Sequence, residues 1–391
     1  MNNSGGGANM DAETGIREIT ALSRRYGADR DYVIAGGGNT SYKNSATLWI
    51  KGSGVALGDM TPDDFIAMDR KKLAAIWEKA LAGADGKSYP AEEAAREAAV
   101  LADMMAAKKT DGEKRRPSVE TLLHDLLPFA YVVHTHPPLV NGMCCGRDGR
   151  QIAASLFGAG ALWIPCSDPG FVLAVTIRKA LEEAGTAPSI ILLQNHGIFA
   201  AADASEAIDA IYRDVMSALH KKIIRSPDFG GEVTAFGESG RVAASLAAAA
   251  SKQAGAARGV SFIRNNEIAR LVSDRASFGA AGVPFTPDHI VYAGSDPLFI
   301  ERGEDVEAAF RRHCDQSGRA PKIAACQGLG VFGIGVNEKS AVTALELFGD
   351  WIRVAVYAES FGGPLPMTRE KIGFINSWEA ENYRSQLSEK Q

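Results

Sequence analysis

Residues 130–137 have the sequence AYVVHTHP, and this stretch decides how the rest of the chain is interpreted. Its first four residues are apolar or aromatic, which is typical of a buried strand, and we predict a strand over residues 130–136. Alternate side chains of a strand share a face, so the imidazoles of His134 and His136 point the same way. At this spacing both rings can bind one cation.

A third histidine follows another apolar run. Residues 189–194, SIILLQ, predict a buried strand that leads into Asn195-His196-Gly197. Three neutral imidazoles from His134, His136 and His196 leave one coordination position open, which is the catalytic zinc pattern. The alternative is that these are structural histidines, and the two apolar strands that lead into them favour the metal. Three imidazoles also bind divalent ions other than zinc.

A carboxylate lies shortly before the first two histidines. In Pro117-Ser118-Val119-Glu120, Ser118 suits the N-cap of a helix over residues 118–127, which puts Glu120 in its first turn. The helix dipole stabilises a negative charge there, so Glu120 needs no function to be favourable. The functional interpretation makes Glu120 a general base beside the metal. The sequence leaves both interpretations open.

Two glycine-rich loops each follow a predicted strand. GGGNTS, residues 36–41, follows a strand over 32–34, and KGSG, residues 51–54, follows a strand over 47–50. Glycine lets backbone amides approach an anion closely, and Lys51 adds a positive charge. Tight turns explain both loops about as well, and neither contains a Walker A sequence.

Composition limits the classes of protein that fit. The 391 residues are 46% hydrophobic, carry a formal net charge of −5 and include 41 glycines, which fits a chain of two α/β domains. The acidic balance gives no reason to expect nucleic-acid binding. No continuous apolar stretch of about 20 residues predicts a membrane span, and the first ten residues lack an apolar signal region. The five cysteines, of which Cys144 and Cys145 are adjacent and three are scattered, lack the spacing of a disulfide framework. They indicate a reducing compartment, and we expect a cytoplasmic protein.

The second half contains a glycine pattern that resembles a dinucleotide fingerprint. Gly328, Gly330 and Gly333 satisfy G-x-G-x-x-G, but no helix follows at once. A β-hairpin over residues 323–335 is the better prediction, followed by an amphipathic helix over 338–359.

The four remaining histidines carry weaker signals. His220 and His313 lie in polar helical contexts and are predicted to be solvated. His124 lies one turn after Glu120 and is a minor candidate for supporting the site. His289 follows a Pro-Asp turn and is interpreted as structural.

The motifs GGGNTS, KGSG, PSVE, HTHP and NHG occur in the order seen in the class II aldolase/adducin family, and residues 14–224 resemble that family. It includes fuculose- and rhamnulose-phosphate aldolases and ribulose-phosphate 4-epimerase. The resemblance implies an α/β fold with a three-layer α/β/α core and a central mixed, largely antiparallel sheet. It also assigns candidate roles to eight residues: zinc ligands His134, His136 and His196, the catalytic acid/base Glu120, and a substrate- or phosphate-binding set of Gly38, Asn39, Gly52 and Ser118. We add Lys51 to the binding set because of its positive charge. Lys51 and Val119 depart from the pattern, since hydroxyl residues are usual at both positions.

The implied function is that of a zinc-dependent class II aldolase. Zn²⁺ would bind the oxygens of a ketose, preferably a 1-phosphate, and the retro-aldol reaction would pass through an enediolate held on the metal. A 4-epimerase, dehydratase or decarboxylase on the same fold is the nearest alternative. A non-catalytic, adducin-like interaction protein is an alternative of another class. The family also implies a homo-oligomer, with a tetramer as the usual form, and an acid tyrosine from a neighbouring subunit that the sequence does not place.

Residues 259–391 resemble the segment that follows the aldolase core in fused rhamnulose-phosphate aldolase/short-chain dehydrogenases. The stretches are TPDH at 286–289, GVFGIG at 330–335 and AESFGG at 358–363. No chemistry is assigned to them. We therefore predict a disordered tail over 1–12, a catalytic domain over 13–225, a linker over 226–258 and a smaller C-terminal α/β domain over 259–391. The Ala-rich part of the linker can also form one helix.

Overall fold

The computed structural model describes residues 12–81, 89–279 and 281–378. Contacts within the chain divide it into two compact units that interleave along the sequence. The first comprises residues 1–135, 159–192 and 198–215, and the second comprises residues 136–158, 193–197 and 216–391. The sequence predicts contiguous domains, and their boundaries stay a prediction. Apart from Ala12, the predicted disordered tail lies outside the described residues.

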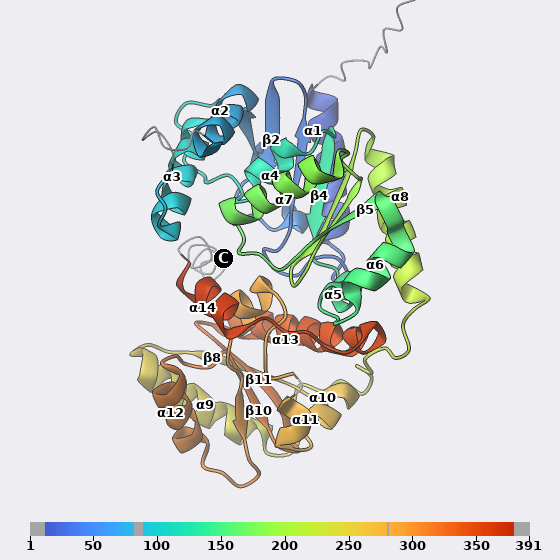
Figure 1. Cartoon of the computed structure of the whole chain (residues 1–391). Coiled ribbons are helices and arrows are strands. Elements are labelled where there is room, and N and C mark those ends of the chain that lie inside the picture. Colours follow the sequence, from blue (N-terminus) through green and yellow to red (C-terminus); the bar gives the residue numbers. More distant parts are fainter. Residues whose placement is uncertain (1–11, 82–88, 280, 379–391) are drawn as a thin grey trace, which may run out of the picture. The chain divides into compact units, whose positions relative to one another are not determined.

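The first unit is built on a mixed seven-stranded sheet with the order β3-β2-β1-β4-β7-β6-β5 (Figure 1). Strands β1–β2, β2–β3, β1–β4 and β4–β7 pair antiparallel, which places β4 in the middle of the sheet. The strands are β1 (Asn39–Lys43), β2 (Thr47–Lys51), β3 (Phe65–Asp69), β4 (Tyr131–Thr135), β5 (Ala161–Ile164), β6 (Ile190–Leu193) and β7 (Gly197–Ala202). The α/β class and the mixed central sheet are confirmed.

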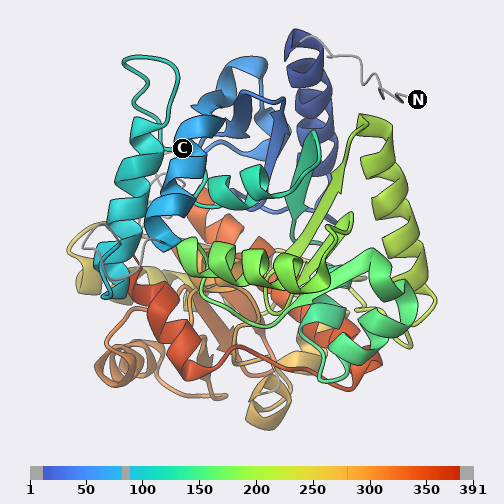
Figure 2. The same cartoon turned by 45° about the horizontal axis from the view of Figure 1, so that its top comes forward.

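Helices cover both faces of this sheet. They are α1 (Ala12–Gly27), α2 (Arg70–Leu81), α3 (Glu93–Ala106), α4 (Thr121–Leu126), α7 (Phe171–Ala184) and α8 (Ser205–His220), with single 3₁₀ turns at Leu57–Asp59 and Pro62–Asp64. On one face, Thr40 of β1 contacts Ser23 of α1 through a 2.7 Å hydrogen bond. On the other face, the next residue, Ser41, contacts His124 of α4. Helix α7, green in Figure 2, packs beside α4. The unit is therefore the expected three-layer α/β/α sandwich.

One predicted strand is wrong. Residues 32–34 form no strand, and the chain turns through Ala35 and Gly38, which have positive φ angles. The strand begins instead at Asn39 and has the polar sequence NTSYK, all of it buried. Two neighbouring strands and both helical layers enclose β1, so it owes its burial to its position in the sheet rather than to apolar side chains.

The second unit contains a four-stranded sheet with the order β8-β11-β10-β9. Its strands are β8 (Gly259–Ile263), β9 (Leu298–Ile300), β10 (Ile323–Cys326) and β11 (Gly330–Gly335). Its helices are α5 (Pro138–Cys144), α6 (Gly149–Phe157), α9 (Ser239–Ala254), α10 (Asn266–Leu271), α11 (Arg275–Gly279), α12 (Val306–Ser317), α13 (Glu338–Ala358) and α14 (Arg369–Ser377), with a π turn at His289–Ala293 and 3₁₀ turns at Gly158–Gly160 and Glu359–Phe361. Helices α9 and α12 cover one face of the sheet and α13 the other (Figure 1). Residues 226–258, predicted as a linker, thus include a helix that belongs to the core of this unit.

The glycine pattern at residues 328–335 forms the predicted hairpin. Strands β10 and β11 pair antiparallel, from Ile323 opposite Gly333 to Cys326 opposite Gly330. Phe332 and Ile334 pack into the core with α9 and α12. Gly333 lies against α13, where a Cβ atom would come within 2.1 Å of the Ala341 carbonyl oxygen. Close approach of the helix explains the glycine, and the dinucleotide interpretation is wrong.

Among the residues that the structure describes, no helix has both the length and the apolar character needed to cross a membrane. The five cysteines are free thiols, including the adjacent pair Cys144 and Cys145.

Candidate metal centre

The structure brings the three sequence-predicted metal ligands together. One ligand nitrogen from each of His134, His136 and His196 lies within 4.8 Å of the others. His134 belongs to β4, His136 follows the end of that strand, and His196 lies in the turn between β6 and β7. Three convergent imidazoles fit a borderline-soft divalent ion such as zinc.

The hydrogen bonds of His134 define which of its nitrogens can bind a metal. Nδ1 lies 2.9 Å from the carbonyl oxygen of Ile198. A carbonyl oxygen only accepts, so Nδ1 carries the proton and Nε2 presents its lone pair. The ring is buried and stacks on Phe199, with centroids 4.1 Å apart and planes at 14°. The backbone and the neighbouring ring together fix the imidazole.

His136 is oriented by the carboxylate of Asp288, which lies outside the predicted site. Its Nδ1 donates to Oδ2 of Asp288 over 2.5 Å, which leaves Nε2 as the nitrogen that presents a lone pair. The Asp288 side chain is buried. Its only signal in the sequence is the TPDH stretch at 286–289, to which no chemistry was assigned.

His196 is presented by a strained turn. Asn195 has a φ angle of +58°, in the left-handed region, which asparagine adopts more readily than most residues. Its Nδ2 donates to the carbonyl oxygens of Phe285 and Leu365 over 3.1 and 2.9 Å. The carbonyl oxygen of His196 itself accepts from Nδ2 of Asn141 at 3.2 Å. The side-chain amides of two asparagines therefore hold the turn that carries the third imidazole.

A chain of buried hydrogen bonds fixes the carboxylate of Glu120 beside His134. Desolvation by burial lowers the pKa of His124 well below its usual value, so its imidazole is neutral. Its Nε2 donates to Oδ1 of Asn39, and its Nδ1 accepts from Ser41 Oγ at 2.7 Å. The amide nitrogen of Asn39 donates to Glu120 Oε2 over 2.5 Å, and this oxygen lies 3.5 Å from His134 Nε2. His124 thus supports the site through Asn39.

Ser118 is not the N-cap that the sequence predicts. Helix α4 begins only at Thr121, and Glu120 occupies the N-cap position without a side-chain capping bond. Ser118 Oγ instead accepts from the backbone amide of Glu120 at 3.2 Å. Residues 118–120, which directly precede the helix, therefore form a turn that fixes the backbone of Glu120.

The two glycine-rich loops lie next to these segments. Gly38 has a φ angle of +69°, and a Cβ atom there would come within 2.6 Å of the His134 carbonyl oxygen, so only glycine fits. Lys51 is buried, and its carbonyl oxygen accepts from the amide of Ser118 at 3.3 Å. Gly52 forms an isolated bridge with Pro117. The structure thus groups Lys51, Gly52 and Ser118, and their binding of a phosphate stays a prediction.

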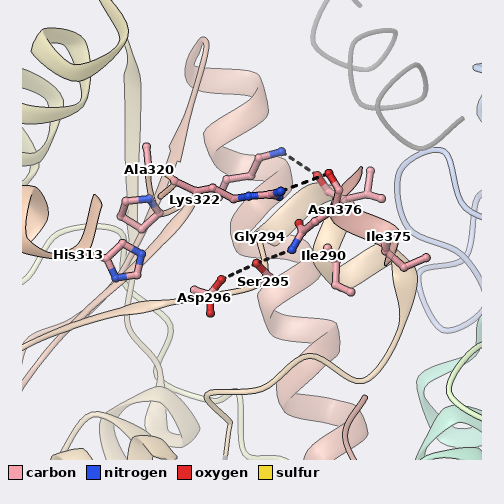
Figure 3. A pocket seen from close by; sticks show the side chains of 12 residues that line it. Ile290, Gly294, Ser295, Asp296, His313, Ala320, Lys322, Ile375 and Asn376 are labelled. Carbon is pink, nitrogen blue, oxygen red and sulfur yellow. Dashed lines mark hydrogen bonds between the residues drawn. The ribbon is translucent and has the colours of Figure 1, made fainter. Parts of the chain in front are cut away.

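A separate pocket of about 180 Å³ lies in the second unit and contains none of the three predicted ligands (Figure 3). Lys322 in its wall donates to the carbonyl oxygen of Val291 over 2.7 Å, and Ser295 donates to Asp296 over 2.6 Å. His313, predicted to be solvated, is half-buried here, and burial lowers its pKa. Its Nε2 is buried and makes no hydrogen bond to the part of the chain that the structure describes.

The other two histidines behave as the sequence predicts. His220 is exposed. His289 is fully buried: it stacks on Trp351, its Nε2 lies 3.0 Å from Asp350 Oδ2, and its Nδ1 accepts from the amide of Phe285 at 3.2 Å. Both of its nitrogens are used inside the protein, which is typical of a structural histidine.

The fold and the site define a class of protein: a three-layer α/β/α sandwich with three convergent imidazoles beside a buried carboxylate. Residues 17–216, just over half of the chain, match the family described as Class II Aldolase and Adducin N-terminal domain. The chain belongs to this family.

Individual relatives cover only part of the chain. "Uncharacterized oxidoreductase YuxG" of Bacillus subtilis (strain 168) is 29% identical over 231 residues, or 56% of this chain and 31% of that protein. The chain thus spans about a third of the length of this curated relative. Among solved structures, the N-terminal class II aldolase domain of a conserved protein from Thermoplasma acidophilum is 24% identical and covers 56% of this chain and 98% of its own, with a TM-score of 0.45. L-fuculose-1-phosphate aldolase from Thermus thermophilus is 20% identical and covers 52% of this chain and 90% of its own, with a TM-score of 0.31.

Proposed function

We propose that the protein is a zinc-dependent aldolase that cleaves a ketose 1-phosphate by a retro-aldol reaction. The observation that carries the proposal is the position of the Glu120 carboxylate, 3.5 Å from Nε2 of His134, one of three convergent imidazoles. A general base beside a Lewis-acid site is the arrangement that proton removal next to a carbonyl requires. Membership of the class II aldolase and adducin family supports the proposal.

The proposed ligands are His134, His136 and His196, and a zinc ion bound to them supplies Lewis-acid polarisation of a substrate oxygen. In the direction of cleavage, Glu120 accepts the proton of the substrate hydroxyl, the carbon–carbon bond breaks, and an aldehyde leaves. Glu120 then delivers a proton to the carbon next to the carbonyl of the remaining fragment. In the direction of synthesis, Glu120 removes that proton. Asn39 and His124 hold its carboxylate in place for both steps.

The substrate phosphate is proposed to lie at Gly38, Asn39, Lys51, Gly52 and Ser118. The contacts of Ser118 with Lys51 and with Glu120 support this grouping. Asn39 is kept in the set although its side-chain amide is engaged at both ends by His124 and Glu120. If Lys51 binds the phosphate, Lys51→Thr lowers the preference for phosphorylated over free ketoses.

The deciding experiment measures exchange of the substrate α-proton with solvent deuterium in Glu120→Gln. We expect exchange to be abolished while the bound metal is retained. Glu97→Gln is the matched control, because Glu97 is a partly buried carboxylate of the same unit that accepts from the amide of Phe171. Unaltered exchange in Glu120→Gln would remove Glu120 from its role.

A screen of ketose phosphates and free keto acids separates this function from its alternatives. Cleavage to an aldehyde supports the aldolase, whereas an epimerised, dehydrated or decarboxylated product identifies one of the other enolising reactions. A purified protein that neither binds a metal nor turns over any of these compounds would favour an adducin-like interaction protein. We also propose a cytoplasmic homotetramer, which light scattering of the purified protein tests.

A further inference from the structure

The part of the chain that lies beyond the family match reaches two of the three proposed metal ligands. The match ends at residue 216. Asp288 accepts from His136, and the carbonyl oxygens of Phe285 and Leu365 accept from Asn195, next to His196. We infer that Asp288 is a positioning residue of the metal centre, through which the C-terminal part of this chain completes a site whose ligands all lie in the family domain. This inference rests on the metal binding of the proposed function.

The hydrogen bond between Asp288 and His136 has the geometry of an outer partner of a metal ligand. Nδ1 lies 2.5 Å from Oδ2, in direct hydrogen-bond contact, and the acceptor is a carboxylate, the usual partner of the second nitrogen of a metal-bound histidine. It holds the proton on Nδ1 and thereby fixes both the ring orientation and the nitrogen that presents a lone pair to the metal. A carboxylate acceptor also makes that lone pair more basic, which strengthens coordination of a cation.

A purely structural role would resemble a second buried pair in the same unit. Asp350 and His289 also form an Asp–His contact, with 3.0 Å between Oδ2 and Nε2. The side chains of Asp288 and Asp350 are similarly buried, with 8% and 9% of their surface exposed. The other nitrogen of His289 accepts a backbone amide, whereas the ligand nitrogen of His136 lies within 4.8 Å of those of His134 and His196. Only the Asp288 pair is connected to a metal site.

The turn that carries His196 is anchored in the same way. Asn195 holds its left-handed backbone conformation while its side chain binds two carbonyl oxygens beyond residue 280. The backbone amide of Asn195 also donates to the carbonyl oxygen of Cys144 at 3.3 Å. Residues after the family match therefore contribute to the placement of His196 as well as of His136.

The test compares Zn²⁺ and Co²⁺ affinity of the full chain by competition with a chromogenic chelator. For Asp288→Ala we expect a loss of about 10- to 100-fold, the range seen when an outer partner of a metal-bound histidine is removed. Asp288→Asn keeps an oxygen acceptor for Nδ1–H but loses the charge, so its loss is smaller. Asp350→Asn is the matched control and keeps wild-type affinity even where it lowers the midpoint of thermal unfolding. The absorption spectrum of bound Co²⁺ reports a changed ligand geometry independently of turnover.

The outcomes separate the inference from the proposed function. If Asp288→Ala keeps wild-type metal affinity and an unchanged Co²⁺ spectrum, the role of Asp288 is overturned and the aldolase proposal stays intact. Asp288→Asn takes the place of the alanine variant if the latter does not fold. Equal losses in Asp288→Asn and Asp350→Asn would show a general packing effect and also overturn that role. A metal-binding protein that depends on Asp288 but cleaves no ketose would overturn the proposed function alone. A wild-type chain that binds no divalent ion would overturn both.

Discussion

Asn39 joins the neutral imidazole of His124 to the carboxylate of Glu120, and its replacement by alanine tests whether this connection holds the proposed base in place. The change removes the donor to Glu120 Oε2 and the acceptor for His124 Nε2–H at once. Both partners are buried, with 4% of Glu120 and none of His124 exposed. Ser41→Ala is the matched variant, because it removes one hydroxyl from the opposite edge of the same imidazole.

The size of the effect follows from the number of buried groups that lose a partner. Each costs about 1–3 kcal/mol, so Asn39→Ala lowers the free energy of unfolding by about 2–6 kcal/mol and Ser41→Ala by about 1–3 kcal/mol. A displaced carboxylate also lowers the rate of proton transfer, and a shift of about 1 Å costs on the order of 100-fold. We expect this loss in Asn39→Ala and a much smaller one in Ser41→Ala.

Urea unfolding followed by circular dichroism measures the stability of both variants, and α-proton exchange measures the reaction. A positioning role lowers kcat, whereas loss of a phosphate contact raises KM, so the two roles proposed for Asn39 are distinguishable. If Asn39→Ala unfolds like the wild type and exchanges protons at the wild-type rate, the hydrogen-bond chain does not hold Glu120 and this reasoning is refuted.

Three further variants test other parts of the structure. Gly333→Ala places a Cβ atom against the Ala341 carbonyl oxygen, so it lowers the urea midpoint through overpacking of about 1–3 kcal/mol, whereas a nucleotide loop would predict altered NADH binding instead. Burial lowers the pKa of Lys43 to about 7, so between pH 7 and about 10.4 the unfolded chain binds more protons and stability rises with pH. Lys43→Met removes that rise. If the unfolding free energy of the variant still increases from pH 7 to pH 9 by as much as that of the wild type, this explanation is contradicted. Asn195→Ala loses two hydrogen bonds and adds backbone strain of about 1–3 kcal/mol, and it lowers metal affinity as well as stability; unchanged affinity would show that this turn does not position His196.

Elements with a strong local pattern were predictable from the sequence. The apolar runs that become β4 and β6 and the periodicity of α13 each have one dominant interpretation, and the structure confirms all three. The hairpin at β10 and β11 was predictable because no helix follows its glycines. Strand β1 was not predictable, since its polar residues are buried only by strands and helices that are distant in the sequence.

The candidate site shows the same limit. HTH and NHG identify three imidazoles because chemistry and spacing coincide within a few residues. The partners that orient them follow no such rule: Asp288 is 152 positions from His136, and Asn39 is 81 from Glu120. Such contacts depend on the packing of the whole chain, and no local pattern marks the residues that make them.

The central claim is that His134, His136 and His196 hold one divalent ion beside Glu120. Elemental analysis of the full chain, purified without chelator, tests it directly when His134→Ala and His196→Ala are measured alongside the surface variant His220→Ala. We expect one divalent ion per chain in the wild type and in His220→Ala, and loss of that ion in the other two variants. A wild type without stoichiometric metal, or metal retained after removal of either proposed ligand, would contradict the claim.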